Sequence, residues 1–97
     1  MPTYIAMLKW TSQGLQDIKQ SPSRLDAVRK DFEPLGVKMK NFYMVTGHYD
    51  MVVIVEAPDD AAIAKALLGA ASQGKITSET CRAFTEDEYR QILSRLP

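Results

Sequence analysis

The sequence predicts an α+β domain whose strands and two main helices alternate in the order β-α-β-β-α-β. Four segments have strand patterns, either the two-residue alternation of a half-buried strand or a short run of apolar and β-branched residues. Two alanine- and leucine-containing segments between them have the three-to-four spacing of amphipathic helices. A capped polar segment near the C-terminus predicts a further short helix. This order is that of a ferredoxin-like sandwich with one four-stranded antiparallel sheet.

Length and charge limit the classes of protein to consider. The 97 residues fit a single domain, 1–97. Twelve basic and twelve acidic residues cancel, so the basic surface typical of nucleic-acid binding is absent and no nucleic-acid partner is expected. The lone Cys81 allows no internal disulfide, and no apolar run is long enough to span a membrane. We therefore expect a cytoplasmic protein without membrane contact.

The strands divide into central and edge positions. The first, Thr3–Trp10, and the third, Tyr49–Ala57, carry apolar residues on both faces, which is typical of central strands. The fourth, Lys75–Phe84, is rich in polar and β-branched residues, which favours an edge position. The second, Val37–Thr46, takes the other edge if the β-α-β crossovers are right-handed. A tight turn at Thr46-Gly47-His48 should join the second strand to the third.

The helix boundaries follow from capping residues. Ser21-Pro22 predicts a helix start with a hydroxyl N-cap and proline in the first turn, and Pro34 predicts its end. The second helix should open at Pro58-Asp59-Asp60 and be capped by Gly74. Residues Thr85–Glu88 form a capping box, in which the threonine caps and the glutamate reaches back to it.

Two helices can cover only one face of such a sheet. The other face would expose an apolar register of the first and third strands, and a patch of that size rarely faces water. We therefore expect a second copy to cover it through a two-fold contact. The other possibility is that Leu15, Ile18 and the last helix fold over this face within the same chain.

Three segments of the chain resemble the GYD-domain family: MPTYIAMLKWTSQG at the start, TGHYDMVVIVEAPDD at the hairpin and TCRAFTEDEYRQIL near the end. The Gly-Tyr-Asp signature reads here as Gly47-His48-Tyr49-Asp50, with one residue inserted. The resemblance covers nearly the whole chain. It implies a dimeric α/β barrel and a homodimer or higher homo-oligomer, but it implies no settled activity. The hairpin is also similar to one in leucine-responsive regulators, where such turns lie near small-molecule sites between subunits.

The hairpin supplies the strongest candidate site. In a structural interpretation, Gly47 permits the turn and Asp50 accepts backbone N–H bonds. In a functional interpretation, these residues border a ligand pocket between subunits, and His48 can titrate near neutral pH. Arg82 could pair with a carboxylate ligand or Asp50, or form a surface ion pair. The candidate ligand-binding residues are His48, Tyr49, Asp50, Trp10, Tyr43 and Arg82.

Other side chains of interest have a structural and a functional interpretation. The aromatic and methionine residues line either a ligand pocket or a core and dimer interface. Cys81 is expected to be a small buried residue rather than a nucleophile. A single histidine and no catalytic motif mean that no metal, cofactor or catalytic residue is predicted. The aromatic and methionine set is Tyr4, Met7, Trp10, Met39, Phe42, Tyr43, Met44 and Met51.

Three functions remain open at this point. The first is small-molecule binding or sensing by a dimer, at a pocket between sheet faces near the Gly47–Asp50 hairpin. The second, by analogy of fold alone, is a cofactor-independent monooxygenase-like enzyme or a haem-handling enzyme of the dimeric α/β-barrel type. The third is an oligomeric interaction module without a ligand.

Overall fold

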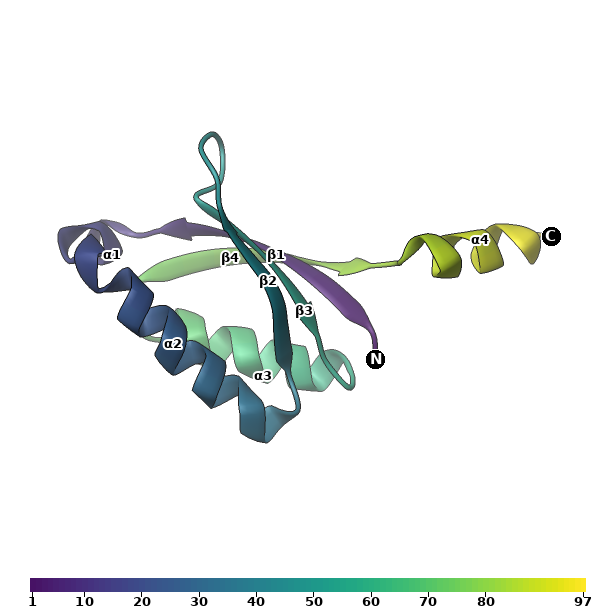
Figure 1. Cartoon of the computed structure of the whole chain (residues 1–97), viewed down its shortest axis with the longest axis horizontal. Coiled ribbons are helices and arrows are strands. Elements are labelled where there is room, and N and C mark those ends of the chain that lie inside the picture. Colours follow the sequence, from purple (N-terminus) through teal and green to yellow (C-terminus); the bar gives the residue numbers. More distant parts are fainter.

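The computed structural model describes all 97 residues and contains one four-stranded antiparallel sheet with helices on one side (Figure 1). The strand order is β2-β3-β1-β4, which confirms that the first and third strands are central and the fourth is an edge. The strands are β1 (Thr3–Trp10), β2 (Lys38–Met44), β3 (Met51–Glu56) and β4 (Ile76–Ala83). The helices are α1 (Ser12–Gln16), α2 (Ser21–Phe32), α3 (Asp60–Ala71) and α4 (Glu86–Ser94), with 3-10 turns η1 (Ile18–Gln20) and η2 (Glu33–Leu35).

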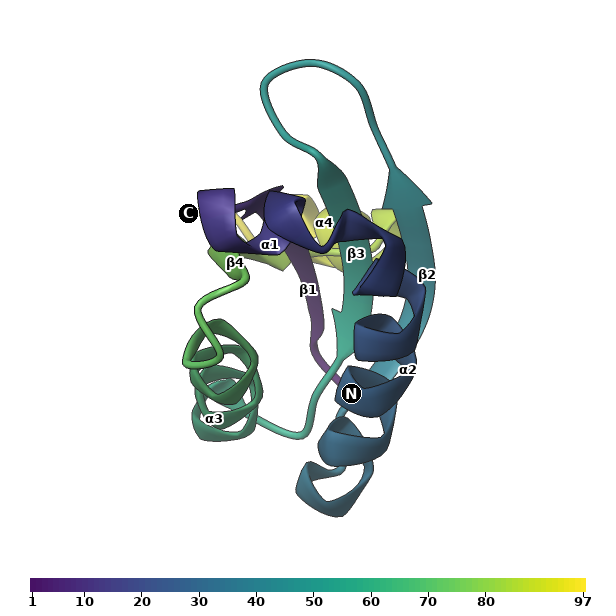
Figure 2. The ribbon, with the colours of Figure 1, turned by 90° about the vertical axis from the view of Figure 1, so that its left-hand side faces the viewer.

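Helices α2 and α3 lie beneath the same face of the sheet (Figure 2). Alternate residues of β1 and β3 point toward them and are buried, as the period of two requires. The core therefore lies between this face and the two helices. Its buried members are Tyr4, Ala6, Leu8, Phe32, Val37, Met51, Val53, Val55, Ala57, Ile63 and Ala66.

Polar contacts fix the ends of the helices. The Tyr4 hydroxyl donates to the carboxylate of Asp60 (2.5 Å) and so connects β1 to the start of α3. This hydrogen bond raises the pKa of Tyr4 above its usual value. Asp59 caps α3 by accepting the backbone N–H of Ala62 (2.8 Å). The capping box is confirmed, because Thr85 and Glu88 exchange both hydrogen bonds.

Three local details differ from the sequence predictions. Ser21 is the first residue of α2 and not its N-cap, because a 3-10 turn runs directly into the helix. The connection from β2 to β3 is a six-residue loop, 45–50, closed by the Val45 N–H donating to the Asp50 carbonyl (2.8 Å), rather than a tight turn. The C-cap of α3 is Ser72, and Gly74 adopts a positive φ of 79° beyond the helix.

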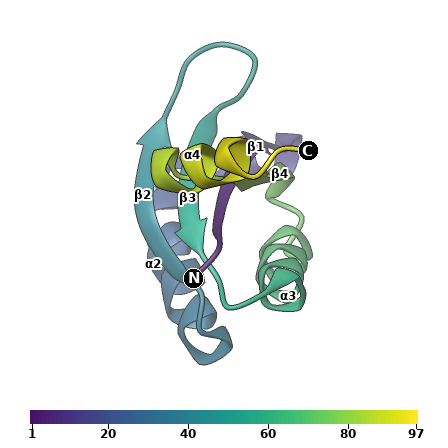
Figure 3. The same cartoon turned by 90° about the vertical axis from the view of Figure 1, so that its right-hand side faces the viewer.

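The side of the sheet opposite α2 and α3 carries no helix in Figure 1. We call this side the open face. Helix α4 continues outward from the end of β4 and does not fold back over it, and viewed from that end it lies in front of the sheet (Figures 1 and 3). Leu15 also remains exposed, and Ile18 lies on the helix side, beside Trp10 and Leu25. The possibility that the chain covers its own open face is therefore wrong for this structure. None of the helices has the length and apolar character needed to cross a membrane.

Candidate functional site

The open face has an apolar centre. Strand register places one set of alternating side chains from each strand on it, opposite the buried set. Ile5 and Met7 of β1 pair with Ile54 and Val52 of β3, and all four are half-buried. Tyr43 of β2 pairs with Val52 and is exposed. These five residues form a continuous apolar patch across three strands.

Cys81 also lies on the open face, because it pairs with Ile5 in the register of β1 and β4. Its thiol-bearing side chain is exposed. The expectation of a buried cysteine is therefore wrong: β4 is an edge strand, and this side of it has no covering helix.

Tyr49 lies at the border of the apolar patch. Its hydroxyl donates to the Glu79 carboxylate (2.9 Å), and the Lys9 ammonium lies 5.9 Å from the centre of its ring. The hydrogen bond to Glu79 raises the pKa of the Tyr49 phenol. His48 is exposed and contacts the Tyr49 ring edge-on, with the ring centres 4.7 Å apart. The loop therefore brings a phenol, a carboxylate and a cation together on the open face.

Asp50 is bound within its own chain. One carboxylate oxygen accepts the backbone N–H of Trp10 (3.0 Å), while the Asp50 N–H donates to the Leu8 carbonyl (2.9 Å). Asp50 thus extends the pairing of β1 with β3 by one residue and holds the base of the loop. This is the arrangement expected from the structural interpretation of the hairpin.

The remaining candidate residues do not gather around the loop. The Trp10 side chain is on the helix side of the sheet, because it is in phase with the buried residues of β1. Arg82 is at the other end of the sheet, where it forms an ion pair with Glu88 (3.5 Å) and its guanidinium lies 4.4 Å from the centre of the Phe84 ring. The structure therefore brings His48 and Tyr49 together and separates them from Trp10 and Arg82.

An apolar cleft lies on the helix side of the sheet, between the sheet and helices α2 and α3. It has a free volume of about 80 Å³, and 14 of its 16 lining residues are hydrophobic. Four members of the predicted aromatic and methionine set line it: Trp10, Met39, Phe42 and Met51. Met7 and Tyr43 face the opposite way, so the predicted set is divided between the two faces.

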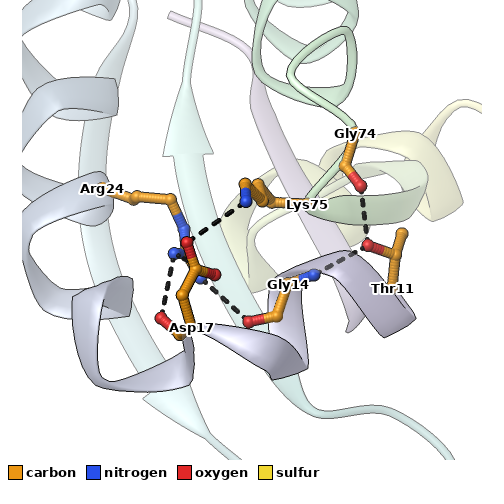
Figure 4. Close-up of polar contacts among 6 residues, drawn as sticks. All are labelled: Thr11, Gly14, Asp17, Arg24, Gly74 and Lys75. Carbon is orange, nitrogen blue, oxygen red and sulfur yellow. Dashed lines mark hydrogen bonds and ion pairs between the residues drawn. The ribbon is translucent and has the colours of Figure 1, made fainter.

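A polar cluster, not predicted from the sequence, closes one end of the helix layer (Figure 4). Asp17 accepts from Arg24 of α2 (3.0 Å) and from Lys75, the residue before β4 (3.2 Å). The hydrogen bond from Lys75, followed by the nearby Arg24 charge, lowers the pKa of Asp17. Arg24 also donates to the Gly14 carbonyl (3.3 Å). All these groups are satisfied by each other, so the cluster joins three elements rather than presenting a free binding group.

The arrangement as a whole resembles an interface more than a reaction centre. An apolar patch bordered by charged and hydroxyl groups is the usual anatomy of a protein contact. No group of three or more His, Cys, Asp or Glu side chains is placed to hold a metal ion.

Comparisons with known proteins agree on the fold. The chain is 37% identical over 85 residues to the glutamine synthetase and cystathionine beta-lyase binding protein of Thermus thermophilus, covering 87% of this chain and 90% of that protein. The leucine response regulatory protein of Mycobacterium tuberculosis is similar in structure (TM-score 0.65, 12% identity), with 87% of this chain and 51% of that one covered. A protein of solved structure from Thermus thermophilus matches with a TM-score of 0.56 and 23% identity over 88% of this chain and 95% of that one.

The chain spans about half the length of the mycobacterial regulator, so that likeness shows the fold alone. The family assignment rests on sequence. The model of the GYD domain matches residues 4–93, which include nearly the whole sheet and the Gly47–Asp50 loop. The chain belongs to the GYD-domain family.

Proposed function

We propose that this chain is a homodimeric binding module whose partners are other proteins. The observation that carries the proposal is the apolar patch of Ile5, Met7, Val52, Ile54 and Tyr43 on the open face. Contiguous apolar surface that no element of the same chain covers is typical of protein contacts. A second copy of the chain covers the patch by a two-fold contact, in which both protomers use the same surface. The cytoplasmic location expected from the sequence belongs to the same proposal.

The protein partners are suggested by the relative from Thermus thermophilus, whose name states that it binds glutamine synthetase and cystathionine beta-lyase. At 37% identity over most of both chains, a shared kind of activity is a reasonable inference. We therefore propose metabolic enzymes of this type as partners of the dimer. The loop 45–50 rises above the open face in Figure 1 and remains accessible at its tip, where Gly47 and His48 are exposed.

Two measurements test this function. Sedimentation velocity should show a dimer at micromolar concentration, and Val52→Asp should raise the dimer Kd at least about 100-fold, because a carboxylate would be buried unpaired at the contact. Purified glutamine synthetase and cystathionine beta-lyase should then bind the wild-type dimer in a calorimetric titration. A wild-type monomer would refute the homodimer, and two null titrations would refute the proposed partners.

A second candidate function is small-molecule binding between the two sheet faces near the Gly47–Asp50 hairpin. The observation that favours it is the group formed by Tyr49, Glu79 and Lys9, which offers hydrogen-bonding atoms at the border of an apolar surface. A metabolite screen by thermal shift should find compounds that raise Tm, and Tyr49→Phe should abolish the effect while leaving the unliganded Tm within a few degrees. An unchanged shift in Tyr49→Phe would place the ligand elsewhere.

A further inference from the structure

Helix α4 has an apolar stripe that its own chain leaves uncovered. Tyr89, Ile92 and Leu93 recur at spacings of three and four, so they share one side of the helix. They are 53%, 46% and 45% exposed, and the flanking Phe84 and Leu96 are 54% and 65% exposed. Figure 1 shows why: α4 points away from the sheet and from both packed helices. We call residues 84–97 the C-terminal arm.

The arm is nevertheless held in a defined direction. Its first turn is fixed by the capping box of Thr85 and Glu88. Glu88 also pairs with Arg82 of β4, and the Arg82 guanidinium stacks on Phe84. These contacts anchor the base of the arm to the sheet and set the direction of α4.

A helix of this length needs a packing surface. Alpha-helices shorter than about 12 residues are marginal in water, and most of their stability in proteins comes from burying an apolar side. The nine residues of α4 have a good cap and an i,i+4 ion pair between Glu86 and Arg90 (2.7 Å). These features contribute only a little, so the exposed stripe requires a surface outside this chain.

We infer that the C-terminal arm packs on a second copy of this chain, each protomer covering its partner with its own α4. The inference rests on the proposed homodimer and identifies a part of its interface that the sheet alone does not supply. The occupant of the stripe is the partner protomer, not a client protein.

The area available on the sheet supports this occupant. The face has four strands of six to eight residues. At about 4.8 Å between strands and about 3.4 Å per residue, it measures on the order of 450 Å². A stable interface buries about 800 Å² on each partner. The five apolar side chains of the arm, each about half exposed, add accessible apolar surface on the order of 500 Å² beyond the outline of the sheet.

The sheet register indicates where the arm would lie. Ala83 pairs with Thr3, which pairs with Glu56. Glu56 in turn pairs with Lys38, so the end of β4 and the start of β2 are at the same end of the sheet. If two sheets face each other about an axis parallel to the strands, β4 of one protomer lies over β2 of the other. The arm then leaves its sheet beside the start of its partner's β2.

The charges at these two places are complementary. The first turn of the arm carries the acidic Glu86 and Asp87, while the start of β2 carries Lys38 and Lys40. Within one chain, Asp87 and Lys38 form no ion pair. Contact between protomers would bring the two unpaired opposite charges together. Such a pair would favour this relative orientation over its reverse.

Ile92→Asp in the full chain tests the inference, with Leu68→Asp as the matched control. Leu68 is on α3, is 71% exposed and lies outside the arm. Sedimentation should show the dimer Kd raised at least about 100-fold by Ile92→Asp and changed less than about threefold by the control. A melting curve of each variant, compared at equal concentration, establishes that the sheet domain remains folded. A wild-type Kd in Ile92→Asp would overturn the inference.

A charge exchange gives a second test that leaves the apolar stripe intact. Asp87→Lys should weaken the dimer several-fold, and mixing it with Lys38→Asp should restore a heterodimer, because each protomer supplies one member of each pair. Failure of this mixture to recover affinity would overturn the proposed orientation of the arm.

Comparison with Val52→Asp separates this inference from the proposed function. If Val52→Asp is monomeric and Ile92→Asp is dimeric, the sheet contact stands and the arm inference fails. If Ile92→Asp is monomeric and Val52→Asp is dimeric, the open face is not the contact and both proposals fail as stated. If Ile92→Asp remains dimeric but loses binding of glutamine synthetase, the arm is a client contact and the inference is overturned.

Discussion

Gly14→Ala is the substitution whose effect the structure determines most directly. Gly14 is buried in α1, and a Cβ added there would lie 2.2 Å from the Lys75 carbonyl oxygen, whereas real Cβ contacts stay beyond 3.0 Å. The same oxygen accepts the Thr11 N–H (2.9 Å), and the Thr11 hydroxyl donates to the Gly74 carbonyl (2.6 Å). The obstacle is backbone and cannot rotate away, so α1 and the start of β4 must separate.

The expected loss of stability follows from three effects. Forcing an extra methyl group into a packed site costs about 1–3 kcal/mol. Breaking the hydrogen bond between Thr11 and Lys75 costs about 1 kcal/mol more. Against these losses, alanine in place of glycine stabilises a helix by about 1 kcal/mol. The free energy of unfolding should therefore fall by about 2 kcal/mol, which corresponds to roughly 8–16 °C in Tm for a domain of this size.

Gly69→Ala provides the matched control. Gly69 is also helical, but an added Cβ meets nothing within 4 Å. This substitution should leave Tm unchanged or raise it slightly. Both variants are compared with the wild type by calorimetry at one protein concentration, because association changes Tm. A Gly14→Ala protein as stable as Gly69→Ala would refute the close approach of α1 to β4.

Three further substitutions have predicted outcomes. The cationic neighbours of Asp17 lower its pKa in the folded protein. The ion pairs of Asp17 therefore contribute fully to the free energy of unfolding above the unfolded pKa of about 3.9, and this contribution is lost as the pH falls through the lower folded pKa. The Tm difference between wild type and Asp17→Asn should therefore shrink in acid; a difference independent of pH would contradict the ion pairs. Asp59→Ala removes the N-cap of α3 and should lower the free energy of unfolding, measured with urea, by about 1 kcal/mol. An unchanged free energy would contradict the cap. Asp50→Ala removes the acceptor of the Trp10 backbone N–H and should speed hydrogen exchange at that amide. Unchanged protection of the Trp10 amide would contradict this role of Asp50.

The sequence predicted the elements whose signal is local or strongly periodic. The apolar pattern of β1 and β3 identified both central strands. A strand that carries apolar residues on both faces shows no alternation of apolar and polar residues. The capping box at Thr85 was recognisable because both of its hydrogen bonds lie within four residues. Fold class and family follow from these features together with the signature.

The contacts that the sequence could not predict depend on register. Apart from Ile76 at its start, the residues of both phases in β4 are polar or small, so its pattern only weakly distinguishes the helix side from the open face. A shift of one residue would bury Cys81 and remove Glu79 from Tyr49. The pairing of Asp17 with Lys75 also joins residues 58 positions apart and has no local signal.

The last two residues of the GYD signature have different surroundings in the structure. Asp50 is used inside the chain, where its carboxylate accepts the N–H of Trp10 and holds the base of the loop. Tyr49, the residue before it, is directed onto the open face by its bond to Glu79. An aspartate that anchors the loop is what allows the adjacent tyrosine to be presented at a fixed position. If the proposed contact of the open face includes Tyr49, loss of the Asp50 anchor should weaken that contact.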